Sequence, residues 1–299
     1  MRIIFVLCEG PHDVAFLSRL LSADGYVKYR QPLSKFPEPL DKWMTKISKD
    51  LSIEDLSLDR MYDDIKAVLP SNAILNEEKK HLILLYSMNG DSHEKRRDKV
   101  ISALRTWSRP PADDKEFSFM EESSEAGNNY GLIVLFDADD KGVDSRISEA
   151  KAKLCECFPM AESISSNGDV IYTDENIKIG IYIFADPVTK MGTLENILLP
   201  IMRQDNEQMF DDAQTFLDKH HDETRLKSLI FKKTPEGMCE KRDKRHKFHP
   251  VKSLMGVVGQ LQNSGTSNTV CIEKADYITL EKIKNSCICQ DILQMFNKL

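Results

Sequence analysis

The chain has 299 residues, enough for one large domain or for one domain with a sizeable elaboration. Hydrophobic residues make up 41% and charged residues 30%, with 13 Gly and 12 Pro, which excludes collagen-like, low-complexity and wholly disordered chains. The 41 Lys and Arg residues against 48 Asp and Glu residues give a net charge of −7. An overall basic coat for nucleic acid is therefore excluded, although a local basic patch is not.

The sequence contains no segment that predicts membrane insertion or export. No apolar run approaches the roughly 18 residues that a membrane-spanning helix needs. The N-terminal apolar run from Ile3 to Cys8 is too short for the central region of a signal peptide, and Glu9 follows it directly. We therefore expect a cytoplasmic protein without membrane contact.

The seven Cys residues predict reduced thiols. Their number is odd and they are scattered along a chain that is not small, which disfavours a disulfide framework. Two Cys-x-Cys pairs, at 155–157 and 287–289, have a poorer spacing for zinc than CxxC. Cys239, His246 and His249 lie in a basic stretch without an obvious fourth ligand, so we interpret this stretch as a solvated loop.

Four apolar runs, rich in β-branched residues, are typical of strands that are buried on both faces of a parallel sheet. They span 2–8, 81–87, 131–136 and 179–184. A segment with helical character follows each run. After the first run it begins at Pro11, and after the second it contains Val100, Leu104 and Trp107. After the third run it covers about 143–158, and after the fourth it follows Gly192. This alternation predicts an α/β fold with a mostly parallel, Rossmann-like central sheet flanked by helices.

Other segments do not follow this rhythm. Residues 28–80 begin with several Pro residues and predict a helical insertion that covers one edge of the sheet, and residues 109–128 predict an exposed loop. From about residue 201 the pattern indicates helices separated by a basic linker at 232–252. We predict an α/β domain over 1–200 and a helical C-terminal extension over 201–299 that packs on it.

Acidic side chains follow two of the most apolar strands. Glu9 comes directly after the first strand, and Asp137 and Asp139 follow the third, two apart, so that in an extended chain both point to the same side. Ligands of open α/β sheets bind at these carboxyl ends. Carboxylates gathered there repel one another unless a cation neutralises them, and hard oxygen ligands suit Mg²⁺ or Mn²⁺. The plainer alternative is a helix cap at Glu9 and an ordinary acidic turn at Asp137.

These motifs resemble the Toprim domain, which topoisomerases, bacterial-type primases and OLD-family nucleases share. The resemblance rests on Glu9-Gly10-x-x-Asp13 and Asp137-x-Asp139, and it covers about 1–30, 80–108 and 130–200. It implies a compact sheet, a general acid/base role for the glutamate and Mg²⁺ binding by the DxD aspartates. Gly192-x-Leu194-Glu195 resembles a segment of the OLD-like, uncharacterised Toprim branch, in which an extra acidic residue joins a second metal position.

The sequence also departs from the known Toprim proteins. The insertion at 28–80 is far longer than in minimal Toprim domains, and no GxxxxGK[ST] sequence, primase-type zinc module or topoisomerase gate is present. What remains is a free-standing Toprim protein, for which a nuclease is the leading interpretation. A separate ATPase partner and an oligomer are both compatible with it.

The resemblance assigns roles to individual residues. Asp137 and Asp139 would hold a divalent ion against the scissile phosphate, with Glu9 nearby as ligand and as the group that activates water or protonates the leaving oxygen. Asp13 or Glu195 would orient a second ion, although Asp13 equally suits an acid that interacts with the helix dipole. The phosphate backbone of DNA or RNA would contact a basic run. The alternative interpretation of this run is a solvated loop. Its residues are Lys232, Lys233, Lys241, Arg242, Lys244, Arg245, Lys247 and Lys252. Lys247 and Lys252 are candidate transition-state cations.

Two other interpretations remain open. A catalytically silent Toprim domain could serve as a binding or regulatory module, although every acidic position is intact. A haloacid-dehalogenase-like phosphatase also uses a DxD after a strand, but that motif normally follows the first strand and would leave Glu9 without a role.

Overall fold

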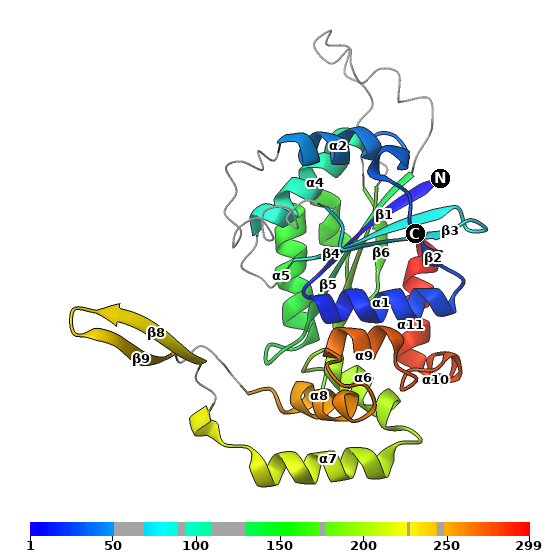
Figure 1. Cartoon of the computed structure of the whole chain (residues 1–299). Coiled ribbons are helices and arrows are strands. Elements are labelled where there is room, and N and C mark those ends of the chain that lie inside the picture. Colours follow the sequence, from blue (N-terminus) through cyan, green and yellow to red (C-terminus); the bar gives the residue numbers. More distant parts are fainter. Residues whose placement is uncertain (51–68, 89–93, 109–128, 174–176, 226–227, 244–247) are drawn as a thin grey trace. The chain divides into compact units, whose positions relative to one another are not determined.

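The computed structural model describes residues 1–299 except 51–68, 89–93, 109–128, 174–176, 226–227 and 244–247 (Figure 1). The loop predicted at 109–128 lies outside the described residues. The chain divides into two compact units. The first combines Met1–Ile197 with Thr279–Leu299, and the second is Leu198–Ile278. The first boundary is near the predicted one, whereas the return of the last 21 residues to the first unit was not predicted.

The first unit is built on a seven-stranded sheet in the order β2-β3-β4-β1-β5-β7-β6. Its strands are β1 (Arg2–Cys8), β2 (Val27–Lys28), β3 (Asn72–Asn76), β4 (His81–Ser87), β5 (Asn129–Asp137), β6 (Val170–Tyr172) and β7 (Ile177–Phe184). The four central strands β4, β1, β5 and β7 are parallel, and they are the four predicted from their apolar runs. The prediction of a mostly parallel sheet flanked by helices is confirmed.

The short strands at the edges are antiparallel and were not predicted. β3 pairs with β4, β2 pairs with β3, and β6 pairs with β7. The insertion expected to be helical therefore extends the sheet: it contains β3, a short 3₁₀ turn at Leu33–Lys35 and helix α2 (Leu40–Asp50).

Helices cover both faces of this sheet (Figure 1). Alternate β1 residues Ile3, Phe5 and Leu7 share one core with α2, α4 (Glu94–Ser108) and α5 (Val143–Cys155). The opposite face carries α1 (Pro11–Ala23), which contacts β1, β3 and β4. The C-terminal helices α10 (Leu280–Asn285) and α11 (Cys287–Lys298) contact α1 on that face. A 3₁₀ turn at Pro159–Ser163 follows α5.

Helix α6 (Leu194–Arg203) begins in the first unit and ends in the second. The second unit continues with α7 (Glu207–His220), a 3₁₀ turn at Glu223–Arg225, α8 (Pro250–Gln262) and α9 (Asn268–Lys274). It also contains a hairpin of β8 (Ser228–Thr234) and β9 (Gly237–Asp243), which corrects the prediction of a basic linker here. Pro235 and Glu236 form its two-residue turn, and Gly237 closes it at a φ of +128°.

Two expectations, on the thiols and on membrane-spanning helices, can be compared with the structure. All seven Cys residues are free thiols. In the part of the chain that the structure describes, no helix has the length and apolar character needed to cross a membrane.

Candidate functional site at the carboxyl ends of β1 and β5

The candidate site lies between two neighbouring strands whose following helices pack on opposite faces of the sheet. β1 and β5 are parallel neighbours, with Cys8 opposite Leu135, as the shared-site prediction requires. The helix that follows β1 packs on one face of the sheet, and α5, which follows β5, packs on the other. Such a switch point opens a crevice at the carboxyl ends of the two strands, the usual ligand site of open α/β sheets.

Glu9 reaches across this crevice to Asp137. The backbone N–H of Asp137 donates a hydrogen bond of 3.2 Å to Glu9 Oε2. Glu9 is partly exposed, so its carboxylate is held by protein on one side and open to solvent on the other. Glu9 therefore lies beside Asp137 at the carboxyl ends of the two strands, as expected from the sequence.

Asp13 caps its own helix and is at the same time part of the acidic group. Pro11 begins α1, and the Asp13 carboxylate accepts a 2.7 Å hydrogen bond from the Gly10 N–H. The side chain is buried. Burial raises the pKa of Asp13 to about 7, and the nearby charges of Glu9 and Glu195 add to this rise, against the lowering effect of the Gly10 hydrogen bond.

Asp137, the last residue of β5, is the most strongly perturbed acid of the site. It is only 8% exposed, and its Oδ1 accepts a 2.8 Å hydrogen bond from the Leu194 N–H. Burial raises the pKa of Asp137 to about 9, with further increases from Asp13, Glu9 and Glu195. Carboxylates from β1, α1, β5 and α6 therefore act on one another in this crevice.

Asp139 does not continue the strand, which corrects the premise of an extended Asp-x-Asp segment. Its φ is +49°, and its backbone exchanges hydrogen bonds of 2.7 and 2.8 Å with Gly192. The side chain is 47% exposed. Asp139 joins Glu9 through a shared partner, Arg146, whose Nη2 lies 3.3 Å from Asp139 Oδ2 and 3.5 Å from Glu9 Oε2.

Glu195, the predicted second-metal residue, is engaged with His12. It is 2% exposed, its Oε1 lies 2.7 Å from His12 Nδ1, and its Oε2 accepts a 2.7 Å hydrogen bond from the Thr193 hydroxyl. Sequence reasoning missed His12. The available signal was its place between Glu9 and Asp13 at the start of α1.

Arg146 is the other residue that sequence reasoning missed. It lies in the first turns of α5, on the face that also buries Ile147 and Ala150, and it is 5% exposed. Its Nε donates a 2.7 Å hydrogen bond to the Asp137 carbonyl, and its Nη1 lies 3.2 Å from Glu149 Oε2. The available signal was a basic residue on the apolar stripe of the helix after Asp-x-Asp.

The five carboxylates have the chemistry that a hard divalent cation prefers, but they are not arranged as a preformed metal site. The donors are carboxylate oxygens, which Mg²⁺ and Mn²⁺ prefer, and their mutual repulsion favours a cation among them. Within the described ranges, no three His, Cys, Asp or Glu side chains are arranged to hold a metal ion. Each of the five carboxylates is bonded to a protein donor: Glu9 to Asp137 N–H, Asp13 to Gly10 N–H, Asp137 to Leu194 N–H, Asp139 to Arg146 and Glu195 to His12 and Thr193.

The predicted nucleic-acid-binding residues belong to the second unit. Lys241 and Arg242 are exposed on β9, where Lys241 pairs with Ile230 and Arg242 with Leu229. Lys252 lies in α8, and Lys232 and Lys233 are exposed on β8. The remaining predicted residues, Lys244, Arg245 and Lys247, lie outside the described residues.

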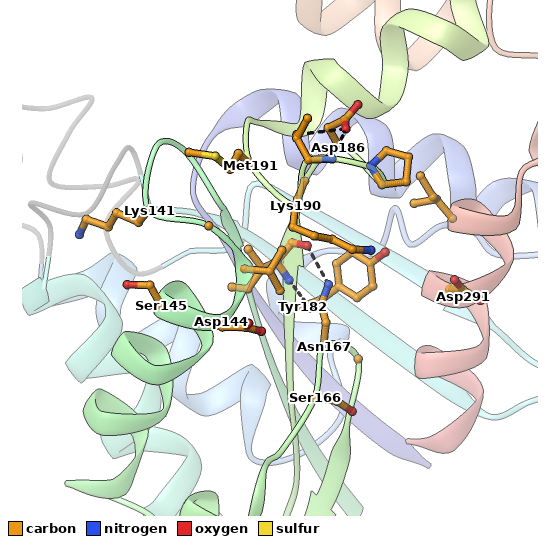
Figure 2. A pocket seen from close by; sticks show the side chains of 18 of the residues that line it. Lys141, Asp144, Ser145, Ser166, Asn167, Tyr182, Asp186, Lys190, Met191 and Asp291 are labelled. Atoms are coloured by element: carbon orange, nitrogen blue, oxygen red, sulfur yellow. Dashed lines mark hydrogen bonds between the residues drawn. The ribbon is translucent and has the colours of Figure 1, made fainter.

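A separate cavity of about 840 Å³ lies in the first unit, lined by the segment that follows Asp139, the segment that precedes Gly192, residues 165–168 and one side of α11 (Figure 2). Asn167 forms part of its wall, held by two hydrogen bonds to the backbone of Ile183. Three Lys and three Asp residues line it, so its charge favours no ligand class: Lys141, Lys190, Lys298, Asp144, Asp186 and Asp291. None of the five site carboxylates lines it.

Comparison with known proteins places the chain in a family. A family model described as "Protein of unknown function (DUF3226)" matches residues 4–235. The chain belongs to this family. A search of curated proteins gives no match. Among solved structures, the chain is similar to the crystal structure of hypothetical protein PH0156 from Pyrococcus horikoshii OT3, with a TM-score of 0.52 and 15% identity over 100% of this chain and 95% of that chain. The DUF3226 match includes all five carboxylates, His12 and Arg146.

Proposed function

We propose that this DUF3226 protein is a divalent-metal-dependent phosphodiesterase that cleaves nucleic acid at a Toprim-like site. The observation that carries the proposal is the gathering of Glu9, Asp13, Asp137, Asp139 and Glu195 at the switch point between β1 and β5. Burial and mutual repulsion raise the pKa of both Asp13 and Asp137, so their ionised forms are disfavoured in this crevice. A bound divalent cation would make the ionised carboxylates favourable again, and acids with such raised pKa values in a crevice support a cationic ligand there.

The residues would act as follows. Asp137 and Asp139 would hold Mg²⁺ or Mn²⁺, which when bound would neutralise charge on the scissile phosphate. Glu9, partly exposed and adjacent to Asp137, would take a proton from water or give one to the leaving oxygen. Because the two oxygens of Glu195 are bonded to His12 and Thr193, this residue suits the task of fixing His12 better than that of a second metal ligand.

Charge in the second unit supports nucleic acid as the substrate. Residues 228–252 contain eight Lys and Arg against three Asp and Glu, in a chain of net charge −7. Lys241 and Arg242 are exposed on β9, where they could contact phosphates. The substrate class includes both DNA and RNA, and a separate ATPase remains a compatible partner.

The test is cleavage of single- and double-stranded DNA and RNA by the purified chain with Mg²⁺ or Mn²⁺. Asp137→Asn and Asp139→Asn each remove a charged ligand and should lower cleavage by at least about 100-fold. Glu9→Gln should lose turnover but keep more metal affinity than the Asp variants, since an amide cannot transfer the proton. Asp144→Asn is the matched control, because Asp144 is an exposed acid in the first turn of α5.

Thermal melting without added divalent ions gives a second readout. Asp137→Asn should melt above the wild type at neutral pH, because the amide can still accept the Leu194 hydrogen bond, whereas burial and the neighbouring acids force Asp137 to take up a proton on folding. Cleavage by Glu9→Gln at the wild-type rate would refute its acid/base role. Asp137→Asn cleaving as well as Asp144→Asn would refute the metal site.

One observation favours a second candidate, the silent binding module. The five carboxylates are already held by protein donors in the described structure. Nucleic-acid binding by the wild type with no cleavage under any divalent ion would support this module and refute the nuclease.

A further inference from the structure

The buried guanidinium of Arg146 is aimed at Asp139, a proposed metal ligand, and at Glu9, the proposed acid/base beside it. Two bonds anchor it from one side: Nε donates to the Asp137 carbonyl at 2.7 Å, and Nη1 lies 3.2 Å from Glu149 Oε2. The group also lies 5.5 Å from the centre of the Phe136 ring. Because guanidinium is planar and rigid, these contacts fix the direction of the remaining nitrogen.

That remaining nitrogen, Nη2, lies between Glu9 and Asp139. It is 3.5 Å from Glu9 Oε2 and 3.3 Å from Asp139 Oδ2, both long for a charge-assisted hydrogen bond, whose usual length is about 2.7–2.9 Å. The anchors on Asp137 and Glu149 are shorter. The 2.7 Å bond to the Asp137 carbonyl is the shortest of these four contacts, so Arg146 is attached most firmly to the end of β5.

We propose that Arg146 competes with the divalent ion for the carboxylates of this site. Its positive charge lies between Glu9 and Asp139, and an ion that binds Asp137 and Asp139 beside Glu9 must draw Asp139 away from Nη2. The inference rests on the proposed metal-dependent function and extends it, because it makes Arg146 a positioning residue that sets how much Mg²⁺ the site needs.

A purely structural role for Arg146 predicts the opposite sign. If the residue only fastens α5 to the end of β5, its loss should disorder Asp137 and Asp139 and weaken Mg²⁺ binding. If it competes, its loss should strengthen Mg²⁺ binding, because a unit positive charge a few ångströms from a divalent ion opposes it strongly in a partly buried site. The direction of the change in Mg²⁺ affinity separates the two roles.

The experiment is calorimetric titration of the full chain with Mg²⁺ alone, without nucleic acid. Arg146→Gln and Arg146→Met should bind Mg²⁺ at least about tenfold more tightly than the wild type. Arg146→Lys keeps the charge and should stay within about threefold. Lys141→Gln is the matched control, because Lys141 is bonded to the same Glu149 but is exposed, and its loss should change the affinity by less than about threefold.

The outcomes decide the inference separately from the proposed function. Unchanged or weaker Mg²⁺ binding by both neutral variants, or their failure to melt cooperatively, would overturn the role of Arg146. Absence of measurable Mg²⁺ binding by the wild type and both neutral variants would overturn it too. Tighter Mg²⁺ binding by the neutral variants, without any nucleic-acid cleavage by the wild type, would support the inference and refute the nuclease. Cleavage by the wild type, with unchanged Mg²⁺ affinities of the neutral variants, would support the nuclease and refute the inference.

Discussion

His81 illustrates how single buried polar residues link this protein to pH. It begins β4, is buried, and its Nδ1 lies 3.0 Å from the Tyr26 hydroxyl. Burial, together with the positive charges of Arg2, Lys79 and Lys178, lowers the pKa of His81 to about 4. An unfolded histidine titrates near 6.5, so between these values the unfolded chain binds more protons than the folded one. The stability from neutral His81 is present above about pH 6.5 and lost as the pH falls towards 4.

We therefore expect the wild type to lose more thermal stability between pH 7 and pH 4.5 than His81→Asn, which can keep a polar contact to Tyr26 but cannot titrate. The measurement is the melting midpoint of both proteins across this range. Equal slopes would show that His81 takes up its proton in the folded protein as easily as in the unfolded one.

At the scale of residues, sequence reasoning found acids but not their partners. Glu9 and Asp137 could be predicted because each ends an apolar strand, and the ends of neighbouring parallel strands meet. His12 and Arg146 could not, because their pairing with Glu195 and Glu9 joins residues 183 and 137 positions apart. Such pairings depend on the side to which each helix packs, which no local pattern encodes.

At the scale of elements, the segment before α6 supports the site through one glycine. Gly192 has a φ of +93°, and a Cβ there would lie 2.5 Å from Asn196 Oδ1, which accepts the Thr193 N–H. Gly192→Ala should lower the free energy of unfolding by about 1–3 kcal/mol and disturb the Leu194 contact to Asp137. Gly10→Ala should cost clearly less, since a Cβ there meets no atom within 4 Å. Denaturant unfolding of both variants is the test, and equal losses would contradict it.

The elements that could be predicted are those with the strongest local signal. The four central strands are apolar on both faces, and their patterns indicate burial without tertiary information. β3 is short and has Asn at both ends, so its sequence carries little strand signal. The hairpin at β8 and β9 was missed because neither strand alternates apolar and polar residues, and its Lys and Arg residues indicated a loop.

At the scale of the whole molecule, the C-terminal segment is part of the first unit's core. Phe296 and Leu299 are fully buried, and a Cβ at Gly131 in β5 would lie 3.3 Å from Leu299. Phe296→Ala should cost about 3–5 kcal/mol and increase hydrogen exchange in β5. Phe216→Ala is the matched control in the second unit: Phe216 is 55% exposed, so its loss should stay within about 0.5 kcal/mol. Comparable losses for the two variants would contradict this placement of α11.

This division of the chain has a consequence for biosynthesis. Chains generally fold domain by domain from the N-terminus as they leave the ribosome, at about 5–20 residues per second. Here the face of β1 and β5 that carries α1 acquires α10 and α11 only after residues 198–278 have been translated. For several seconds the nascent sheet therefore exposes an apolar surface. By then the second unit, whose sequence lies between the two parts of the first, has been translated completely. A chaperone that shields apolar strands would find its substrate in this interval, before the crevice between β1 and β5 has its final support.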